Sequence, residues 1–361
     1  MGQHTCVTDS TSLYENSSAM TPVRKRHVDT LNFLALTGKR PFPRKWALSA
    51  LLLFFLSVPT FADTHSEPLP PELQGDFNKR VGETINSITL FTSQNSVSSG
   101  AFKIQSSDAP DADFFVTRFP LSHEFGEDGD AVRPLIRGVF GTYNQSQSVR
   151  IARPSGGEDF SRLSAASFGV GTGAVWQFLD GFSITPGVDV AYSHVDRKYD
   201  FNTAYSQTVL EPFDRQAFNT DVDVLTYSPS AKLGFATQLG RVAVTLGSKY
   251  THLFNDSIAT RSNIIAINSA TGLWQTTLEL LVPLGLCIQN MPLGVHPFFA
   301  RTDIYGSARS GLSFTYFQEM GADLTVGVRE YVSLLEEVRI GGSYTIGESF
   351  QGWRVGIGLE F

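Results

Sequence analysis

The side chains best suited to acid–base or nucleophilic chemistry are three histidines with two serines nearby: His123, His194, His252, Ser193 and Ser248. A serine hydrolase needs its hydroxyl and imidazole within hydrogen-bonding distance, and a third group must orient the ring. Ser193 and His194 are consecutive, so a β-strand would turn them to opposite faces. Ser248 and His252 would share a face, but four residues of strand separate them too widely for a hydrogen bond. We therefore expect histidines at strand ends without a catalytic role, and no enzyme.

Motifs that bind phosphate or metal ions are missing from the sequence. It contains no nucleophile elbow, and no cysteine and histidine cluster at metal-ligand spacing. The stretch GVGTG at residues 169–173 has the composition of a phosphate loop, but it lies inside an alternating segment with no helix after it. Glycine in a strand allows another backbone to approach closely. We expect no cofactor and no metal site.

The overall composition departs from that of an ordinary soluble domain. Charged residues make up 17% of the chain, whereas soluble domains carry about 25%. Phenylalanine and glycine are abundant, with 28 and 32 residues. The formal net charge of −7 argues against a nucleic-acid partner, because binding phosphates requires a basic surface.

Residues 39–62, KRPFPRKWALSALLLFFLSVPTFA, have the three parts of a secretory signal peptide. A basic stretch precedes an apolar run over residues 46–58, and small residues lead to Ala62. The run has about 13 residues, fewer than the roughly 20 of a membrane-spanning helix, which is the alternative interpretation. We expect a translation start downstream of Met1 and cleavage after Ala62, so that residues 1–62 are absent from the mature protein.

A polar, proline-bearing segment follows the signal peptide over residues 63–98. It is typical of a periplasmic tether. Near its end, Val81, Ile85, Ile88 and Leu90 recur at roughly helical spacing, which predicts a short amphipathic helix.

From residue 99 onward, apolar and polar residues alternate with the period of a β-strand. In FSITPGVDVAYSH, residues 182–194, Phe182 and Ile184 fall on one face, and Ser183 and Asp189 fall on the other. About twelve such segments follow one another to the end of the chain. They centre near residues 103, 119, 139, 171, 188, 231, 248, 278, 298, 316, 342 and 357.

The links between these segments alternate in length through the middle of the chain. Those at residues 179–181 and 239–241 are very short, whereas those at 145–162, 196–220 and 255–271 are long and polar. A soluble sandwich has no reason for this alternation, but outer-membrane barrels have tight periplasmic turns and long extracellular loops. The sequence therefore predicts an all-β fold over residues 99–361, a transmembrane antiparallel up-and-down barrel with its apolar face toward lipid.

In such a barrel the polar face of each strand lines the lumen. The charged residues on that face are Asp189, Lys232, Lys249, Glu279, Glu337, Arg339, Arg354 and Glu360. An ion-selective pore is lined mainly by one sign of charge, whereas both signs occur here. We expect paired charges that fill a narrow interior, and a small porin or channel is the alternative function.

The chain ends on a complete strand, WRVGIGLEF, with Phe361 as the last residue. A closed barrel leaves no strand edge unpaired, so we expect this strand to pair with the first one. Phe361 would then lie in the periplasmic aromatic girdle. A terminal aromatic residue after alternating apolar residues resembles the signal that the outer-membrane assembly machinery recognises.

Several stretches resemble the solitary outer-membrane autotransporter-type barrels of gamma-proteobacteria. They are ETINSITLFTS (83–93), FFVTRFPLSHEF (114–125), PLIRGVFGTY (134–143) and the C-terminal strand, within a likeness that covers roughly residues 80–361. The resemblance implies a barrel like an autotransporter translocator domain but without a passenger, with a structural or surface role in the bacterial outer membrane. The expected partners are outer-membrane lipid, the assembly machinery and periplasmic chaperones, and the expected state is a monomer. An outer-membrane lipid hydrolase is a second alternative.

Overall fold

The computed structural model describes residues 97–104, 112–126, 130–150, 157–215, 218–260, 268–289, 291–306, 309, 314–328, 331 and 337–360. The signal peptide expected over residues 1–62 lies outside the described residues. So do residues 63–96 of the expected tether and helix, whereas Val97 and Ser98 already belong to the first strand. Phe361 also lies outside the described part of the chain.

The described residues form twelve strands and two short helical turns. The strands are β1 (Val97–Ile104), β2 (Ala112–Glu124), β3 (Val132–Arg150), β4 (Glu158–Leu179), β5 (Phe182–Asp200), β6 (Thr220–Leu239), β7 (Val242–Thr260), β8 (Asn268–Ile288), β9 (Met291–Gly306), β10 (Tyr316–Gly327), β11 (Glu337–Gly347) and β12 (Phe350–Glu360). The helical turns are η1 (Ser206–Leu210) and η2 (Glu211–Phe213), both between β5 and β6. Among the described residues, no helix is long and apolar enough to span a membrane.

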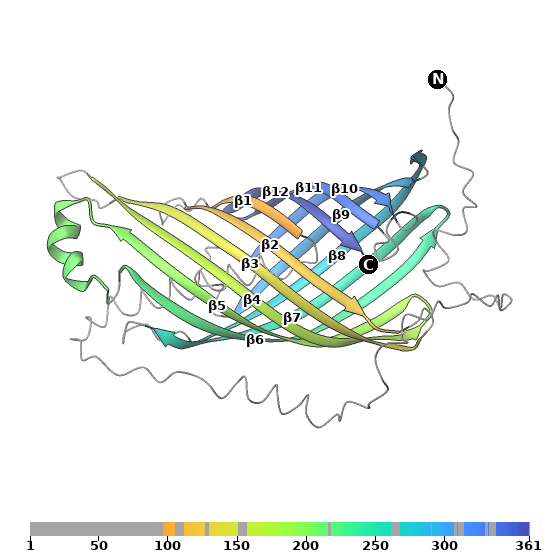
Figure 1. The fold of residues 1–361 in the computed structure, drawn as a ribbon, viewed down its shortest axis with the longest axis horizontal. Coiled ribbons are helices and arrows are strands. Elements are labelled where there is room, and N and C mark those ends of the chain that lie inside the picture. The colour runs from red at the N-terminus through yellow and green to blue at the C-terminus, as the bar shows by residue number, and fades with distance from the viewer. Residues whose placement is uncertain are drawn as a thin grey trace, which may run out of the picture. The chain divides into compact units, whose positions relative to one another are not determined.

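The strands close into an antiparallel barrel in which each strand pairs with its neighbours in the chain (Figure 1). Strands β1 and β12 complete the circle, with Val97 opposite Ile357 and Ile104 opposite Phe350. Closure gives every strand two partners and leaves no edge. The up-and-down barrel predicted from the period-two pattern is therefore confirmed, as is the pairing of the last strand with the first.

The two ends of the barrel differ in their connections. Strands β4 and β5 join through Asp180 and Gly181, and β6 and β7 join through Gly240 and Arg241. Both glycines have positive φ values, +73° and +65°, which favour glycine in tight turns. We call this the tight-turn end, and it also holds the start of β1 and the end of β12. The opposite, long-loop end carries the link 201–219, with η1 and η2.

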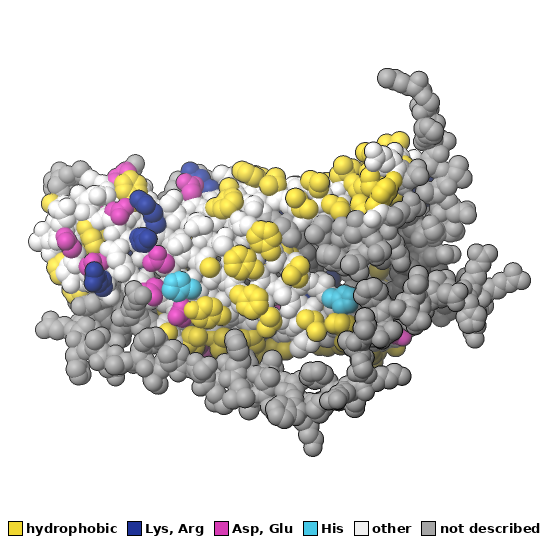
Figure 2. Space-filling model, viewed as in Figure 1, with side chains coloured by type: hydrophobic (Ala, Val, Ile, Leu, Met, Phe, Trp, Pro, Cys, Tyr) yellow, Lys and Arg dark blue, Asp and Glu magenta, His cyan; other side chains and the backbone are white. Residues whose placement is uncertain are grey.

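The strands at the long-loop end extend into segments predicted to be loops. The link predicted at 145–162 is narrowed to 151–157, that at 196–220 to 201–219, and that at 255–271 to 261–267. Strand β4 has 22 residues, about twice what crosses a bilayer. Charged side chains gather at the end that carries η1, away from the apolar band (Figure 2). Beyond that band neither face has to be apolar, so the alternation fades while the strand pairing continues.

The outward face of the barrel is apolar. Phe140, Phe168 and Tyr192 are cross-strand neighbours on β3, β4 and β5, and all are exposed. Figure 2 shows apolar side chains spread over the middle of one side of the barrel. In water this arrangement would be unfavourable, whereas lipid is the natural solvent for such a face. The prediction that the apolar face of the strands points outward is confirmed.

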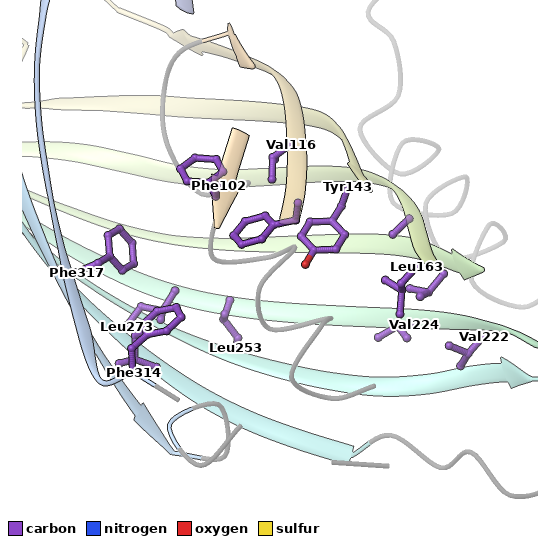
Figure 3. Packing of buried hydrophobic residues seen from close by; sticks show 14 residues of the cluster. Phe102, Val116, Tyr143, Leu163, Val222, Val224, Leu253, Leu273, Phe314 and Phe317 are labelled. Carbon is purple, nitrogen blue, oxygen red and sulfur yellow. The ribbon is translucent and has the colours of Figure 1, made fainter. Parts of the chain in front are cut away.

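The inward face carries an apolar cluster that the alternation did not predict. We call it the luminal apolar cluster, and its members are Phe102, Phe114, Val116, Tyr143, Leu163, Ala165, Val195, Val222, Val224, Leu253, Leu273, Ile304, Phe314 and Phe317. Figure 3 shows them projecting toward the space that the strands enclose. The ring of Phe114 stacks between those of Phe102 and Tyr143, at centroid distances of 5.2 and 5.5 Å. The lumen is therefore apolar over part of its length.

Candidate functional site

Charged side chains line the lumen on the tight-turn side of the luminal apolar cluster. Strand β2 runs toward the tight-turn end and carries Val116 before Arg118. Strand β7 runs the other way and carries Lys249 before Leu253. The lumen thus has an apolar section toward the long loops and a charged section toward the tight turns.

The structure turns all six charged residues named from the sequence toward the lumen: Asp189, Lys232, Lys249, Glu279, Arg339 and Arg354. Asp189 lies between Gly171 and Ser228, and Lys232 lies directly opposite Lys249. Glu279 lies between Thr245 and Phe298. Arg339 lies between Thr325 and Gly358, and Arg354 lies between Ser343 and Gly100. Glu337 shares this face, whereas the side chain of Glu360 lies outside the described part of the chain.

Cations gather on one wall of the charged section, formed by β2 to β7. We call Arg118, Arg137, Lys232 and Lys249 the cationic cluster. The Nη2 of Arg137 donates a hydrogen bond to Oδ2 of Asp189 at 3.0 Å. Lys249 interacts electrostatically with Asp189 and with the three other cations. The alternation of the sequence predicts both lysines on the luminal face but neither arginine.

The facing wall, from β8 to β12, pairs its charges locally. On β9, His296 lies 3.4 Å from a carboxylate oxygen of Glu279 and 3.6 Å from one of Asp323. Glu319 accepts from Ser343 and forms an ion pair with Arg354. These contacts engage the carboxylates with groups on the same wall, while Glu279 also acts electrostatically on Lys232 and Glu319 on Arg118.

A further ion pair on this wall joins two residues of β11 that lie two positions apart. The Nε of Arg339 donates to a carboxylate oxygen of Glu337 at 2.6 Å. Of the charged residues on this wall, Glu279, Glu337, Arg339 and Arg354 were predicted from the sequence, and His296, Glu319 and Asp323 were not.

Glycines make room for the charged groups. In the GVGTG stretch of β4, a Cβ at Gly171 would overlap the carboxylate of Asp189. A Cβ at Gly187 would lie 2.5 Å from a terminal nitrogen of Arg137, and one at Gly173 would lie 2.6 Å from the carbonyl oxygen of Pro186. Real Cβ atoms do not come so close. The stretch therefore provides space for an ion pair and for a neighbouring backbone.

The three histidines singled out from the sequence bear on the hydrolase alternative, and all lie on the outward face. His194 Nδ1 lies 2.7 Å from Oδ1 of Asp223. His252 Nδ1 lies 3.0 Å from the hydroxyl of Tyr250, and the ring of His123 packs edge-on against Phe125. Within the described ranges, none of the three hydrogen-bonds to a serine. In the same part of the chain, no three His, Cys, Asp or Glu side chains are grouped so as to hold a metal ion.

Solved structures similar to this chain include three from autotransporters. The β-domain of the Bordetella autotransporter BrkA is 12% identical, over 74% of this chain and 99% of that one, with a TM-score of 0.47. The transport unit of AIDA-I from Escherichia coli is 11% identical, over 79% and 99%, with a TM-score of 0.46. The translocator domain of NalP from Neisseria meningitidis is 10% identical, over 80% and 98%, with a TM-score of 0.43.

No curated protein sequence matches this chain. A family model described as "Solitary outer membrane autotransporter beta-barrel domain" matches residues 94–358, which include all twelve described strands except the last two residues of β12. This match covers well over half of the chain and agrees with the closed barrel. The chain belongs to the family of solitary outer-membrane autotransporter β-barrel domains and is a protein of the bacterial outer membrane.

Proposed function

We propose that this barrel does not conduct and that its role is to hold a structured surface outside the outer membrane. The luminal apolar cluster is the observation that carries the proposal. Porin channels have a polar, water-filled interior, whereas an apolar constriction expels water and stops the flow of ions. Val224 and Leu253 are 0% and 1% exposed on the luminal face. This packing favours a closed barrel over a small porin.

The long-loop end supports a surface role, because the link 201–219 is tied firmly to the barrel. Asp159 at the tip of β4 is fully buried. Its carboxylate accepts hydrogen bonds from the Tyr199 hydroxyl at 2.9 Å and from the backbone N–H groups of Asn202 and Thr203 at 2.8 and 2.9 Å. The Ser206 hydroxyl adds a fourth bond at 3.0 Å. A fixed loop presents one defined surface instead of many.

Aromatic packing adds to these bonds. The ring of Tyr199 lies 5.0 Å from that of Phe201 and 4.9 Å from that of Phe218. The guanidinium of Arg197 lies 5.6 Å from the ring centre of Phe218. These contacts hold both ends of the link against the strands that carry it.

The proposal assigns no catalytic role to the barrel. A lipid hydrolase would need an outward-facing nucleophile beside its base. His194 instead contacts the carboxylate of Asp223, which also accepts a hydrogen bond from the Tyr192 hydroxyl at 2.7 Å. The outward faces of β5 and β6 therefore offer a histidine and a tyrosine that share one carboxylate, without a serine bonded to the histidine.

The proposed partners of the barrel are outer-membrane lipid around its apolar outer face, and the assembly machinery with periplasmic chaperones during insertion. The tight-turn end would face the periplasm, as the short turns of such barrels do. We further propose that the barrel is a monomer, since closure leaves no strand edge for a second copy to join.

A swelling assay tests the closed state. Liposomes that contain the refolded full chain are diluted into an iso-osmotic solution of a small neutral sugar, and light scattering is followed. A closed barrel predicts no swelling beyond that of protein-free liposomes. Rapid swelling that rises with the amount of folded barrel would contradict the proposal and favour the porin alternative.

A further inference from the structure

On the luminal wall formed by β2 to β7, the two arginines and the two lysines of the cationic cluster differ in their acidic partners. Within the described ranges, Asp189 pairs with Arg137, and Glu319 of the facing wall acts electrostatically on Arg118. No ion pair joins Lys232 or Lys249 to any carboxylate of the described residues. Glu279 acts on Lys232 electrostatically, but its hydrogen-bonding partner is His296. Neither lysine therefore has a direct counter-charge from this part of the chain.

The two lysines are also placed where they repel each other. Lys232 on β6 and Lys249 on β7 are direct cross-strand partners on the luminal face. Like charges at such positions destabilise a sheet, and a chain under selection for stability alone would avoid the pair. Sites that bind a ligand commonly break such a local rule.

The two lysines differ in their surroundings: Gly247 leaves space beside Lys232, and the arginines act electrostatically on Lys249. A Cβ at Gly247, beside both lysines, would lie 2.5 Å from the Thr277 hydroxyl and 3.4 Å from Cε of Lys232. Glycine at this position therefore leaves space beside the aliphatic part of the Lys232 side chain. Lys249 lies within electrostatic range of both Arg137 and Arg118. Donors from four strands thus converge on one region of the lumen.

From this convergence we propose that the cationic cluster binds a soluble oxyanion, a phosphate or carboxylate group, that enters from the tight-turn end. Lysine binds phosphate as a point charge, and arginine offers paired N–H donors to its oxygens. The luminal apolar cluster separates this site from the long-loop end. The ligand therefore comes from the periplasmic side, and binding requires no conduction through the barrel.

Thermal unfolding of the refolded full chain in detergent tests the site, with inorganic phosphate as the probe and chloride at equal ionic strength as the reference. The temperature at which half of the protein loses its folded gel mobility should rise with phosphate concentration, because a ligand of the folded state stabilises it. Succinate replaces phosphate in a second arm, which separates carboxylate from phosphate preference. If neither anion raises the temperature more than chloride does, the proposal is wrong.

The variant Lys249→Gln distinguishes a binding site from a structural cluster. In chloride it should unfold at the same or a higher temperature, because one repulsion with Lys232 is removed. Its affinity for phosphate should fall about ten-fold, the effect of losing one charged hydrogen bond. Lys249→Arg should restore the response. A lower unfolding temperature in chloride with an unchanged phosphate response would overturn the proposal.

The matched control is Lys198→Gln, which removes an exposed lysine from the outward-facing side of β5. Its phosphate response should equal that of the unaltered chain. If Lys198→Gln weakened the phosphate response as much as Lys249→Gln does, the bound phosphate would be an adventitious ion only. If Lys249→Gln fails to fold, Lys232→Gln provides the same comparison. Broadening of the phosphate ³¹P resonance by the unaltered chain gives an independent measure of binding, and no broadening would contradict the site.

Discussion

The guanidinium of Arg137 on β3 reaches past β4 to the carboxylate of Asp189 on β5, at 3.0 Å. Gly171 on the intervening strand lies directly opposite both residues. Because glycine has no side chain, the ion pair can lie across the strand. This relationship links the glycine-rich segment of β4 to the charges of the lumen.

Gly171→Ala tests this relationship. The new methyl group would overlap the Asp189 carboxylate, so the pair would have to separate or the strands would have to shift. We expect a loss of about 1–3 kcal/mol in the free energy of unfolding. Denaturant titration of the refolded barrel measures it.

The control for that variant is Gly138→Ala on β3, where a Cβ would come no closer than 4.0 Å to another heavy atom. We expect a change of no more than about 0.5 kcal/mol. If the two substitutions lowered the free energy of unfolding equally, the ion pair would not depend on the space beside Gly171.

Asp159→Ala should release the link 201–219 while the barrel stays folded. The substitution leaves buried donors of Tyr199, Thr203 and Ser206 without their acceptor, at a cost of about 1–3 kcal/mol for each unsatisfied group. Limited proteolysis should then cut within the link, and the barrel should keep its heat-dependent gel mobility. Asp200→Asn removes an acid from an exposed pair with Arg162 and should leave the link resistant. Resistance of Asp159→Ala would contradict our account of the loop.

Deletion of Phe361 should reduce the amount of folded barrel in the outer membrane, because the end of the sequence resembles the signal that the assembly machinery recognises. Shortening the link 201–219 by a few residues should have a smaller effect. Gel mobility before and after boiling, measured on outer-membrane fractions, gives the folded share for each variant. If the shortened link were the more damaging change, the role assigned to Phe361 would be wrong.

The fold could be predicted because lipid imposes one strict rule on the outward face. In β5, Phe182, Ile184 and Val190 alternate with Ser183 and Asp189, and the pattern identifies both the strand and its direction. The strand ends could not be predicted in the same way. The end of β3, NQSQSVR, is polar on both faces, so its pairing with β4 leaves no trace in the period.

The luminal charges were predicted where one face is apolar and the other polar, as for Lys232 on β6. They were missed where both faces are apolar. On β2, Phe114 and Val116 point into the lumen while Phe115 and Phe119 are exposed outside. The alternation along this strand therefore does not show on which face Arg118 lies. His296 on β9 was missed for the same reason, since the segment MPLGVHPFFA has apolar residues at both parities. On these strands, inward-facing apolar residues remove the contrast between an apolar and a polar face that a prediction from alternation needs.

Planar-bilayer recording most directly tests the central claim that the luminal apolar cluster closes the barrel. The unaltered full chain is compared with the double variant Leu253→Ser, Phe317→Ser, which places hydroxyls in the cluster. The outward-facing control is Leu246→Ser, Leu324→Ser. We predict no steady current through the unaltered chain or the control, and measurable openings in the luminal variant. A steady open current through the unaltered chain would contradict the claim.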